Sequence, residues 1–321
     1  MVKNTSGYIP RIFLIEARFF NRRVLGLDGL DRFLSLKSIG EDVVEEYRSI
    51  FRGIIVQDPG AGSLDIIVAG DHIKLLSPTN EYCHWHNGYL DKRDNPLERI
   101  YCLKKPLSSL GYCREHNDSL RAIYTRCFSG GGIYSLGACK RLDDVFGKTI
   151  MYSLYLLDYG LGVKVGTTRS WRIYDRIAEQ PHVVAARLME SSSAYTIREY
   201  EMRIGELHGL SEKPHRRSLR DVLSYPPRYS LKRLLSVIEK IGKILNIPLP
   251  DQRTVFRILP SIDIAYYNKA KNVEIKDVEG IKLEVMEYWA GYLLVSKCNG
   301  NEYYLIKSKN LLHRNCLGVI R

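Results

Sequence analysis

Apolar and polar positions in the first quarter of the chain follow the short period of β-structure. Apolar stretches at Ile9–Leu14, Ile54–Val56 and Leu64–Val68 are separated by Gly and Asp positions that are typical of turns. Val43–Phe51 interrupts this pattern with a helical spacing. We therefore expect a small β-rich module over residues 7–75 that contains one short helix.

The stretch from residue 150 to residue 210 alternates strand and helix patterns. Tyr152–Leu157 and Val163–Val165 predict two strands joined by a Gly-rich turn, and Val183–Leu188 is a further apolar stretch. Helices are expected over residues 174–179 and 194–207. The buried face of the second helix is expected to consist of Ile197, Tyr200, Ile204 and Leu207.

An amphipathic helix is also expected after Ser230, a residue type that favours helix N-caps. Lys232 and Arg233 would then lie in its first turn, where the helix dipole disfavours cations unless an anion is near. The inward positions of this helix are expected to be Leu231, Leu234, Leu235, Ile238, Ile241 and Leu245.

The C-terminal region is again β-like. Tyr292–Cys298 and Glu302–Lys307 flank Asn299-Gly300, which is a strong signal for a two-residue hairpin turn. We therefore expect a β-hairpin within a β-rich C-terminal module.

The composition is typical of a globular protein: 321 residues, 45% of them hydrophobic and 26% charged. No apolar run is long enough to span a bilayer, and the first residues lack the apolar core of a cleavable leader. We therefore expect a cytoplasmic protein with no membrane partner. Five of the seven cysteines lie within residues 83–139, which favours a metal site over the disulfide framework of a secreted protein.

The positive charge is concentrated in one segment. The net charge is +12, and residues 211–243 hold nine Lys or Arg against three acidic residues, which is half of the excess. Such a basic segment in a nearly neutral setting is expected to bind polyphosphates. The candidate nucleic-acid-binding residues are Lys213, Arg216, Arg217, Arg220, Lys232 and Arg233.

Residues 81–149 carry a candidate zinc site. Zinc prefers four tetrahedral sulfur or nitrogen ligands, and two ligands separated by two residues form half of many such sites. Cys113 and His116 have this spacing, and Cys102 can close the loop onto the same ion. We choose Cys83 as the fourth ligand. We expect a structural zinc, because no pattern for a metal-activated water is present.

Two other residues compete with Cys83 for the fourth position. His86 forms a second two-ligand spacing with Cys83, and Cys127 lies further along the chain. The remaining cysteines are expected to be core residues: Cys139, Cys298 and Cys316.

A second constellation could act on phosphodiesters. Hydrolysis of a phosphodiester needs an oriented nucleophile, a cation against the developing charge and usually a divalent metal held by a carboxylate. Tyr155 (or Tyr152) on a strand, Arg176 on the next helix and Glu201 on a later helix are candidates for these roles. Mg²⁺ or Mn²⁺ would be the metal if the site is catalytic.

The order of these residues and elements resembles that of the GIY-YIG nuclease superfamily. In that superfamily two tyrosine-bearing strands precede a helix with an arginine and a later helix with a glutamate. Leu161–Arg169, Arg176–Gln180 and the Cys/His segment that ends in Gly111–His116 more closely resemble the DUF2797 family. The resemblance covers roughly residues 80–215, and more loosely the C-terminus. It implies that Gly166 is the glycine of the second motif, Arg176 the helix arginine and Glu201 the metal-binding glutamate, with Glu199 as the alternative.

The sequence departs from the superfamily pattern at two positions. Tyr152-Ser-Leu-Tyr155 stands in place of Gly-Ile-Tyr, and Lys164 stands where the second motif has a tyrosine. Lysine also occurs at that position in some branches. The resemblance therefore implies a catalytic set of Tyr155, Lys164, Arg176 and Glu201.

Two main function classes follow. The first is a zinc-containing nucleic-acid-binding protein whose GIY-YIG-like domain is a metal-dependent phosphodiesterase on DNA or RNA. The second is a non-catalytic, ribosome-associated binder of structured RNA such as rRNA or tRNA. The missing tyrosine favours the binder and the retained Arg176 and Glu201 favour the enzyme. A protein scaffold is a weaker third class.

The expected fold class is α+β, with a small mixed-sheet GIY-YIG-like domain and a zinc-stapled module. The predicted organisation is a β-rich N-terminal module (1–80), a zinc-binding module (81–149), the GIY-YIG-like domain (150–210), a basic helical segment (211–250) and a β-rich C-terminal module (251–321).

Overall fold

The structure is a computed structural model, and it describes most of the chain. Within the described residues it contains seven α-helices and two mixed β-sheets, so the predicted α+β class is confirmed. None of the helices in this part of the chain has the length and apolar character that crossing a bilayer requires. The described residues are 7–24, 43–129, 132–207, 210–211, 219–246, 255–298 and 301–320.

The chain forms two compact units, and each combines segments that are far apart in the sequence. Unit 1 contains Met1–Glu16, Ser49–Arg126 and Pro260–Arg321. Unit 2 contains Ala17–Arg48 and Cys127–Leu259. The five consecutive modules expected from the sequence stay a prediction.

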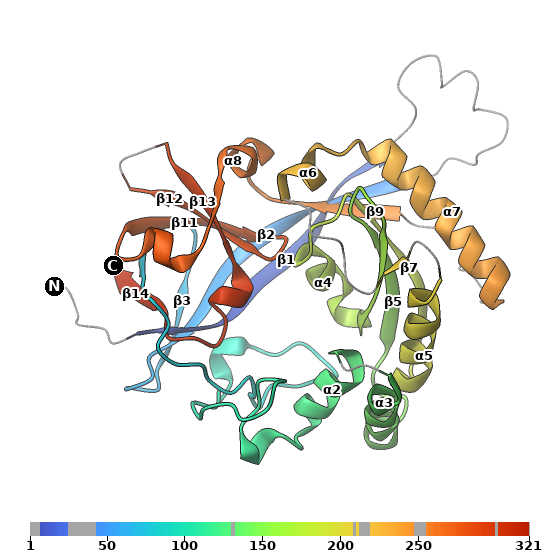
Figure 1. Cartoon of the computed structure of the whole chain (residues 1–321), viewed down its shortest axis with the longest axis horizontal. Helices are drawn as coiled ribbons and strands as arrows, with labels where there is room; N and C mark the ends of the chain where they lie inside the picture. Colours follow the sequence, from blue (N-terminus) through green and yellow to red (C-terminus); the bar gives the residue numbers. More distant parts are fainter. Residues whose placement is uncertain are drawn as a thin grey trace. The chain divides into compact units, whose positions relative to one another are not determined.

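The centre of unit 2 is an antiparallel group of three strands (Figure 1). β5 (Tyr152–Asp158) pairs with β6 (Val163–Arg169) on one side and with β7 (Val184–Ser191) on the other. β8 (Leu210–Ser211) extends the sheet beside β6, and β9 (Val255–Leu259) extends it beside β7. All residues of β5 are buried, which makes this strand the core of the unit.

Helices of unit 2 pack against this sheet. α5 (Ala194–Gly205) contacts β5 and β6, and α7 (Pro227–Leu245) contacts β5 and β7. The sequence segment between β6 and β7 forms the short helix α4 (Ile173–Ala178), and α3 (Gly132–Phe146) packs on α5. The order of elements from β5 to α5 is therefore strand, strand, helix, strand, helix.

The N-terminus of α5 is held by side chains of two elements. Ser193 is its N-cap and accepts a hydrogen bond from the amide of Thr196 at 3.1 Å. Asp143 of α3 accepts hydrogen bonds from the Ala194 amide at 2.6 Å and from the Tyr195 amide at 3.1 Å. These side chains satisfy backbone amides that have no partner inside the helix. The Asp143 carboxylate also lies at the positive end of the helix dipole, where a negative charge is favourable.

The predicted start of the amphipathic helix after Ser230 is wrong. α7 begins at Pro227, a residue type that favours the first helical position because it lacks an amide hydrogen. Ser230 is buried inside the helix, and its hydroxyl donates to Oδ1 of Asp158 at 2.7 Å. Of the predicted inward positions, Leu231, Leu234, Ile238 and Ile241 are buried and Leu235 and Leu245 are half-buried.

Asp158 is the anion that accommodates a cation near the start of α7. Its carboxylate is fully buried at the end of β5. The Arg233 guanidinium donates to both carboxylate oxygens, at 2.5 and 3.0 Å, and the Gly160 amide donates to Oδ1 at 2.7 Å. These charge-assisted hydrogen bonds join α7 to the C-terminal end of β5.

The expected helix over Val43–Phe51 is also wrong, because these residues belong to the strand β2 (Val43–Gln57). The first part of β2 pairs in parallel with β9, from Val44 opposite Val255 to Arg48 opposite Leu259. Glu46 accepts a hydrogen bond from Arg257 of β9 at 2.6 Å. Pairing with a strand more than 200 positions away overrides the local helical spacing.

Unit 1 contains the second sheet. The predicted C-terminal hairpin is confirmed, because β12 (Tyr292–Lys297) and β13 (Tyr303–Lys307) pair antiparallel; the turn Asn299-Gly300 lies outside the described residues. β11 (Lys282–Trp289), β4 (His72–Leu75) and β14 (Leu317–Ile320) follow beside β12 in that order. β10 (Lys271–Val273) lies at the other edge, beside β13.

Two further strands and three α-helices complete the strands and α-helices of the described residues. β3 (Leu64–Ile67) pairs with the last four residues of β2 in unit 1. The long strand β1 is Ile9–Val24. The remaining helices are α2 (Leu120–Ser129), α6 (Leu219–Ser224) and α8 (Ile264–Lys269).

Removal of the Asp158 carboxylate is expected to destabilise unit 2. Asp158→Ala leaves Arg233 without its partner and removes the acceptor of Ser230, and breaking such a buried pair costs about 3–5 kcal/mol. Urea unfolding monitored by circular dichroism measures this change. The control is Asp144→Ala at an exposed position of α3, which should change stability by less than about 0.5 kcal/mol. Equal stability of the two variants would contradict the interpretation.

Candidate functional site

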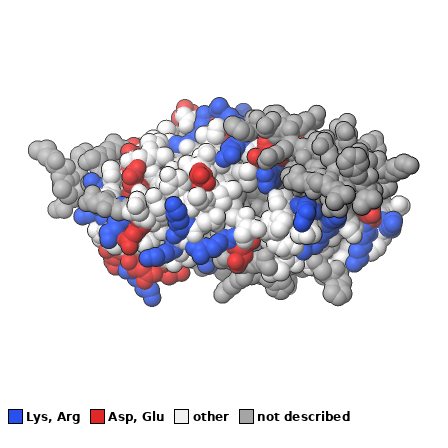
Figure 2. All heavy atoms as spheres, turned by 90° about the horizontal axis from the view of Figure 1, so that it is seen from above, with Lys and Arg blue, Asp and Glu red and all other residues white. Residues whose placement is uncertain are grey.

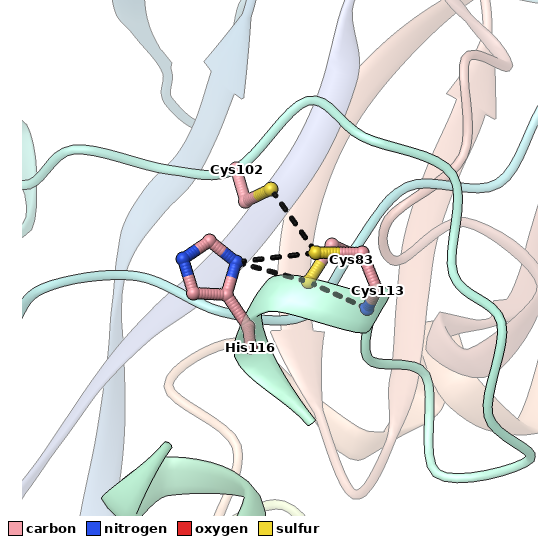
Figure 3. A group of neighbouring side chains, drawn as sticks. All are labelled: Cys83, Cys102, Cys113 and His116. Carbon is pink, nitrogen blue, oxygen red and sulfur yellow. Dashed lines mark hydrogen bonds between the residues drawn. The ribbon is translucent and has the colours of Figure 1, made fainter. Parts of the chain in front are cut away.

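Four side chains in unit 1 converge on one point (Figure 3). The sulfur atoms of Cys83, Cys102 and Cys113 and a ring nitrogen of His116 all lie within 4.8 Å of one another. These are the four residues that the sequence predicts as zinc ligands. Among the residues that the structure describes, this is the one group of three or more metal-ligating side chains.

Three of the distances within this group are close to those of a tetrahedral metal site. Cys102 Sγ lies 3.9 Å from Cys113 Sγ, and His116 Nδ1 lies 3.3 Å from Cys113 Sγ and 3.8 Å from Cys83 Sγ. With metal–sulfur bonds of about 2.3 Å and metal–nitrogen bonds of about 2.0–2.1 Å, tetrahedral ligand atoms lie roughly 3.5–3.8 Å apart. The cluster can therefore hold a metal ion such as zinc.

Local backbone structure positions the ligands. Cys113 immediately precedes a single 3₁₀ turn, Arg114–His116, which turns the His116 ring back toward the sulfur atoms. The Cys113 amide donates to Cys83 Sγ at 3.3 Å, and the Lys104 amide lies 3.5 Å from Cys102 Sγ. Gly111 has φ +85°, and a β-carbon there would collide with the His84 ring. Only glycine meets both requirements at this position.

Burial and amide donors affect the three thiols differently. Burial raises the pKa of Cys102 to about 12 and also raises the pKa of Cys83. Burial acts to raise the pKa of Cys113 too, but hydrogen bonds from the His116 amide and from neighbouring groups lower it below its usual value. Since a metal binds thiolates, it has to displace protons from Cys83 and Cys102, so metal affinity should increase with pH.

Trp85 is a part of the site that the sequence interpretation did not include. Its ring stacks on the His116 imidazole, with ring centres 3.9 Å apart and planes inclined by 3°. This contact fixes the orientation of the imidazole, a role that outer groups often have in metal sites. The position of Trp85 between Cys83 and His86 was the only sequence signal for it.

The two alternative ligands lie elsewhere. His86 accepts a hydrogen bond from the Gly88 amide through Nδ1 at 3.1 Å, and its ring contacts Tyr101. Cys127 forms a disulfide with Cys139, which is buried as expected of a core residue. Of the other cysteines predicted in the core, Cys316 is buried, but Cys298 is only half-buried.

In unit 2, three of the four predicted catalytic residues lie around Gln180. The Gln180 side-chain amide donates to the Tyr155 hydroxyl at 2.9 Å and to the Arg176 carbonyl at 2.9 Å. The Lys164 ammonium donates to the Gln180 side-chain oxygen at 2.7 Å. Gln180 lies just after α4, so α4, β5 and β6 meet at this side chain.

Gly166 is required by the packing of Tyr155. The two residues are directly opposite each other in the β5–β6 ladder. A β-carbon at position 166 would lie 2.6 Å from the Tyr155 ring, which is closer than atoms can approach. The glycine that the resemblance identifies therefore makes room for the tyrosine on the neighbouring strand. The alternative tyrosine, Tyr152, is also buried and contacts Phe128.

Arg176 is held next to a second arginine. Glu179 accepts a hydrogen bond from Arg176 at 3.0 Å and from Arg172 at 2.5 Å. The Glu179 side chain is largely buried. The side chains of Arg176 and Arg172 are 43% and 34% exposed, respectively. One carboxylate thus orients two guanidiniums that remain accessible to solvent. Arg172 was not among the predicted site residues.

Glu201 occupies a closed position. Its Oε2 accepts hydrogen bonds from Arg198 at 2.6 Å and from Thr167 at 2.9 Å, and Glu201 and Arg198 are both buried. Glu201 lies near enough to Tyr155 to raise the pKa of that phenol, although burial is the larger cause. Glu199, the alternative, is half-buried on another side of α5.

The predicted nucleic-acid-binding residues divide into three groups. Arg220 on α6 and Lys232 on α7 are exposed. Arg233 is committed to the buried pair with Asp158. Lys213, Arg216 and Arg217 lie outside the described residues. Figure 2 shows Lys and Arg side chains in several clusters on one face, whereas the largest group of Asp and Glu atoms in that view lies at the lower left.

Comparisons of this chain with family models, with curated proteins and with solved structures found no match.

We expect one zinc ion per chain in the metal centre. Apparent binding free energies at such sites are on the order of 10 kcal/mol, so Cys113→Ser should unfold the loops of unit 1 that carry the ligands. Elemental analysis and limited proteolysis of the purified protein measure the two effects. The control is Cys298→Ser, which changes a half-buried cysteine outside the ligand group and should retain zinc. Protein without zinc, or a Cys113→Ser variant as resistant as the parent, would refute the site.

Proposed function

We propose that this protein is a zinc-containing nucleic-acid-binding protein whose unit 2 holds the phosphate backbone through a GIY-YIG-like arrangement. The observation that carries the proposal is the pair of accessible guanidiniums, Arg172 and Arg176, that Glu179 orients beside Lys164 and Gln180. Preorganised arginines are effective phosphate ligands because the guanidinium can donate two parallel hydrogen bonds.

The order of elements in unit 2 supports the resemblance. Two antiparallel strands, β5 and β6, precede the arginine-bearing helix α4, and the glutamate-bearing helix α5 follows β7. The matched glycine, Gly166, lies directly against Tyr155.

The metal centre supports a structural role for zinc. Four protein ligands complete a tetrahedral site and leave no open position for a substrate or an activated water. Three of the ligands are buried, and their loops contain few regular elements that could hold them in place without the ion. Zinc would therefore supply folding free energy to unit 1.

Further basic and aromatic groups on unit 2 suit a polyphosphate with accessible bases. Residues 219–246 contain six Lys or Arg and two acidic residues. Tyr229 is exposed beside Arg228, whose guanidinium lies 4.8 Å from the ring centre. Aromatic rings of this kind can stack on unpaired bases, and neighbouring cations can contact phosphates. Single-stranded or structured RNA, such as rRNA or tRNA, and DNA both offer these groups.

Two contacts favour binding without cleavage. The Glu201 carboxylate is compensated by Arg198 and Thr167, so a divalent metal would have to compete with a buried ion pair. Tyr155 is 1% exposed, and burial raises the pKa of its phenol despite the opposing effects of Arg176 and Gln180. A buried phenol with a raised pKa is a poor general base near neutral pH.

The second candidate function is a metal-dependent phosphodiesterase, and one observation favours it. Tyr155 interacts electrostatically with both Arg176 and Glu201, so these three of the four predicted catalytic side chains lie in one neighbourhood. In this reading Glu201 would hold Mg²⁺ or Mn²⁺, and Arg176 would stabilise negative charge on the phosphate. The metal would act by polarising the phosphate and the attacking water.

Loss of the two accessible arginines is expected to weaken nucleic-acid binding. Affinity should fall linearly with salt on logarithmic axes, with a slope of about −0.7 to −0.9 per phosphate contact. The double variant Arg172→Gln/Arg176→Gln should bind nucleic acid at least roughly tenfold more weakly than the parent. Its salt slope should be flatter by the amount that corresponds to the loss of about one to two phosphate contacts. Fluorescence anisotropy with labelled structured RNA, single-stranded RNA and duplex DNA measures both quantities.

The matched control for this double variant is Arg187→Gln on β7. Arg187 is 38% exposed and also has a carboxylate partner, Glu190, at 3.2 Å. It should leave the affinity and the salt slope unchanged. Unchanged binding by the double variant, with the fold intact by circular dichroism, would remove Arg172 and Arg176 from the nucleic-acid surface.

A cleavage assay separates the two candidate functions. If the protein only binds, the parent should leave branched DNA, duplex DNA and structured RNA uncut in Mg²⁺ or Mn²⁺. If it is a phosphodiesterase, Glu201→Gln should reduce cleavage by about a hundredfold or more and leave binding nearly unchanged. Glu199→Gln on the same helix is the control, and circular dichroism checks the fold because Glu201→Gln removes the charge partner of Arg198. Equal cleavage by parent and Glu201→Gln would indicate a contaminating nuclease.

A further inference from the structure

Arg11 of β1 is a buried cation next to the metal centre. Its side chain belongs to unit 1 and the residue is 2% exposed. The guanidinium donates hydrogen bonds to the backbone oxygens of Cys83 at 3.3 Å and of Cys102 at 3.0 Å, and to Gln57 Oε1 at 3.2 Å. Two of the four metal ligands are therefore the residues that Arg11 contacts.

The described neighbours of Arg11 include no compensating carboxylate. Its other neighbours are His313, 3.5 Å away, and the rings of Tyr82 and Tyr101, whose centres lie 5.8 and 5.6 Å from the guanidinium carbon. Within the described part of the chain, none of the partners of Arg11 is an acidic residue. A guanidinium always remains charged, so its burial without an opposite charge would be strongly unfavourable.

The metal centre supplies the missing negative charge when it is filled. Three thiolates around one divalent cation, with a neutral imidazole as the fourth ligand, leave one net negative charge. This charge is itself buried and also needs compensation. The one positive charge of Arg11 and the one excess negative charge of the filled centre are therefore opposite in sign and equal in number.

We infer that Arg11 is the counter-charge of the metal centre. The folded state then contains Arg11 paired with a divalent ion that is bound by three thiolates and one imidazole. Arg11 is separated by 72 and 91 positions from the two ligands that it contacts. Metal binding thus favours attachment of β1 to the loops that carry Cys83 and Cys102. A monovalent ion in the same site would leave two negative charges against one guanidinium. The site would therefore bind it less tightly than a divalent ion.

The test compares metal affinities of variants that change the charge and variants that change only the hydrogen bonds. Arg11→Met removes the charge and should weaken zinc binding by about 10- to 100-fold, the range found for outer groups of metal sites. Arg11→Lys keeps the charge but cannot contact both carbonyls, and it should retain most of the affinity. Competition with a chromophoric chelator measures the affinity, and the sulfur-to-cobalt charge-transfer absorption of the Co²⁺ form shows that the ligand set is unchanged.

A double-mutant cycle distinguishes compensation of charge from support of the loops. Cys102→His makes the centre electrically neutral, since two thiolates then balance the divalent ion. In this background Arg11→Met should change the zinc affinity by less than threefold. Gln57→Met, which removes a neighbouring hydrogen bond of Arg11 but no charge, is the matched control and should leave zinc affinity within threefold of the parent.

Three results would overturn the inference. They are an Arg11→Met variant that binds zinc as tightly as the parent, an Arg11→Lys variant as weak as Arg11→Met, and an equal effect of Arg11→Met on the Cys102→His centre. If Arg11→Met does not fold with saturating zinc, the comparison of Arg11→Lys with Gln57→Met decides the question. None of these measurements depends on nucleic-acid binding.

Discussion

Charges that are removed from water have to be compensated inside each unit, and the architecture around both candidate sites follows from this requirement. In unit 2 the buried Asp158 carboxylate joins β5 to α7 because Arg233, Ser230 and the Gly160 amide meet it there. Without them an isolated buried carboxylate would be too costly to keep ionised. The same requirement explains why Arg257 accompanies Glu46 across the β2–β9 pair.

The two candidate sites satisfy this requirement in different ways. The candidate metal centre of unit 1 is closed: its four ligands would surround a bound ion, and on our inference Arg11 would compensate the charge that remains. The basic site of unit 2 is open on one side, because Glu179 is buried while Arg172 and Arg176 reach solvent. A closed centre suits a structural role, and an open, oriented pair of guanidiniums suits an anionic ligand. In the function that we propose, zinc and nucleic acid would therefore bind different parts of the chain.

Glu201 illustrates why a matched motif residue is insufficient to assign catalysis. Its position on α5 agrees with the resemblance, and its carboxylate is close to Tyr155 and Thr167. Arg198, only three positions earlier on the same helix, already compensates the carboxylate. The chemistry available at Glu201 therefore depends on a partner that the motif does not include, and this favours the binding function over cleavage.

Much of the fold was predictable where the signal is local. The strands β5 and β6, the helix α5 and the β12–β13 hairpin follow from short-range periodicity and turn residues. Val43–Phe51 and Ser230 were misassigned because distant partners determine them. β9 pairs with the first of these segments, and Asp158 accepts a hydrogen bond from the hydroxyl of the second. Local propensity contributes only tenths of a kcal/mol per residue, so long-range pairing prevails over it.

The sequence by itself determined half of the candidate metal centre, because the spacing of Cys113 and His116 is that of two zinc ligands within one turn. Zinc's preference for four sulfur or nitrogen ligands indicated Cys102 as the third ligand and left Cys83, His86 and Cys127 as candidates for the fourth. The sequence also determined the strand–helix order that places Lys164 and Arg176 near each other. Only the tertiary structure decided that Cys83 completes the site while Cys127 pairs with Cys139. The tertiary structure likewise placed Arg11 beside the ligands and Glu201 beside Arg198 in the interior. Burial and the distance between residues remote in the chain control the energy of a charge, and neither quantity is encoded in local sequence spacing.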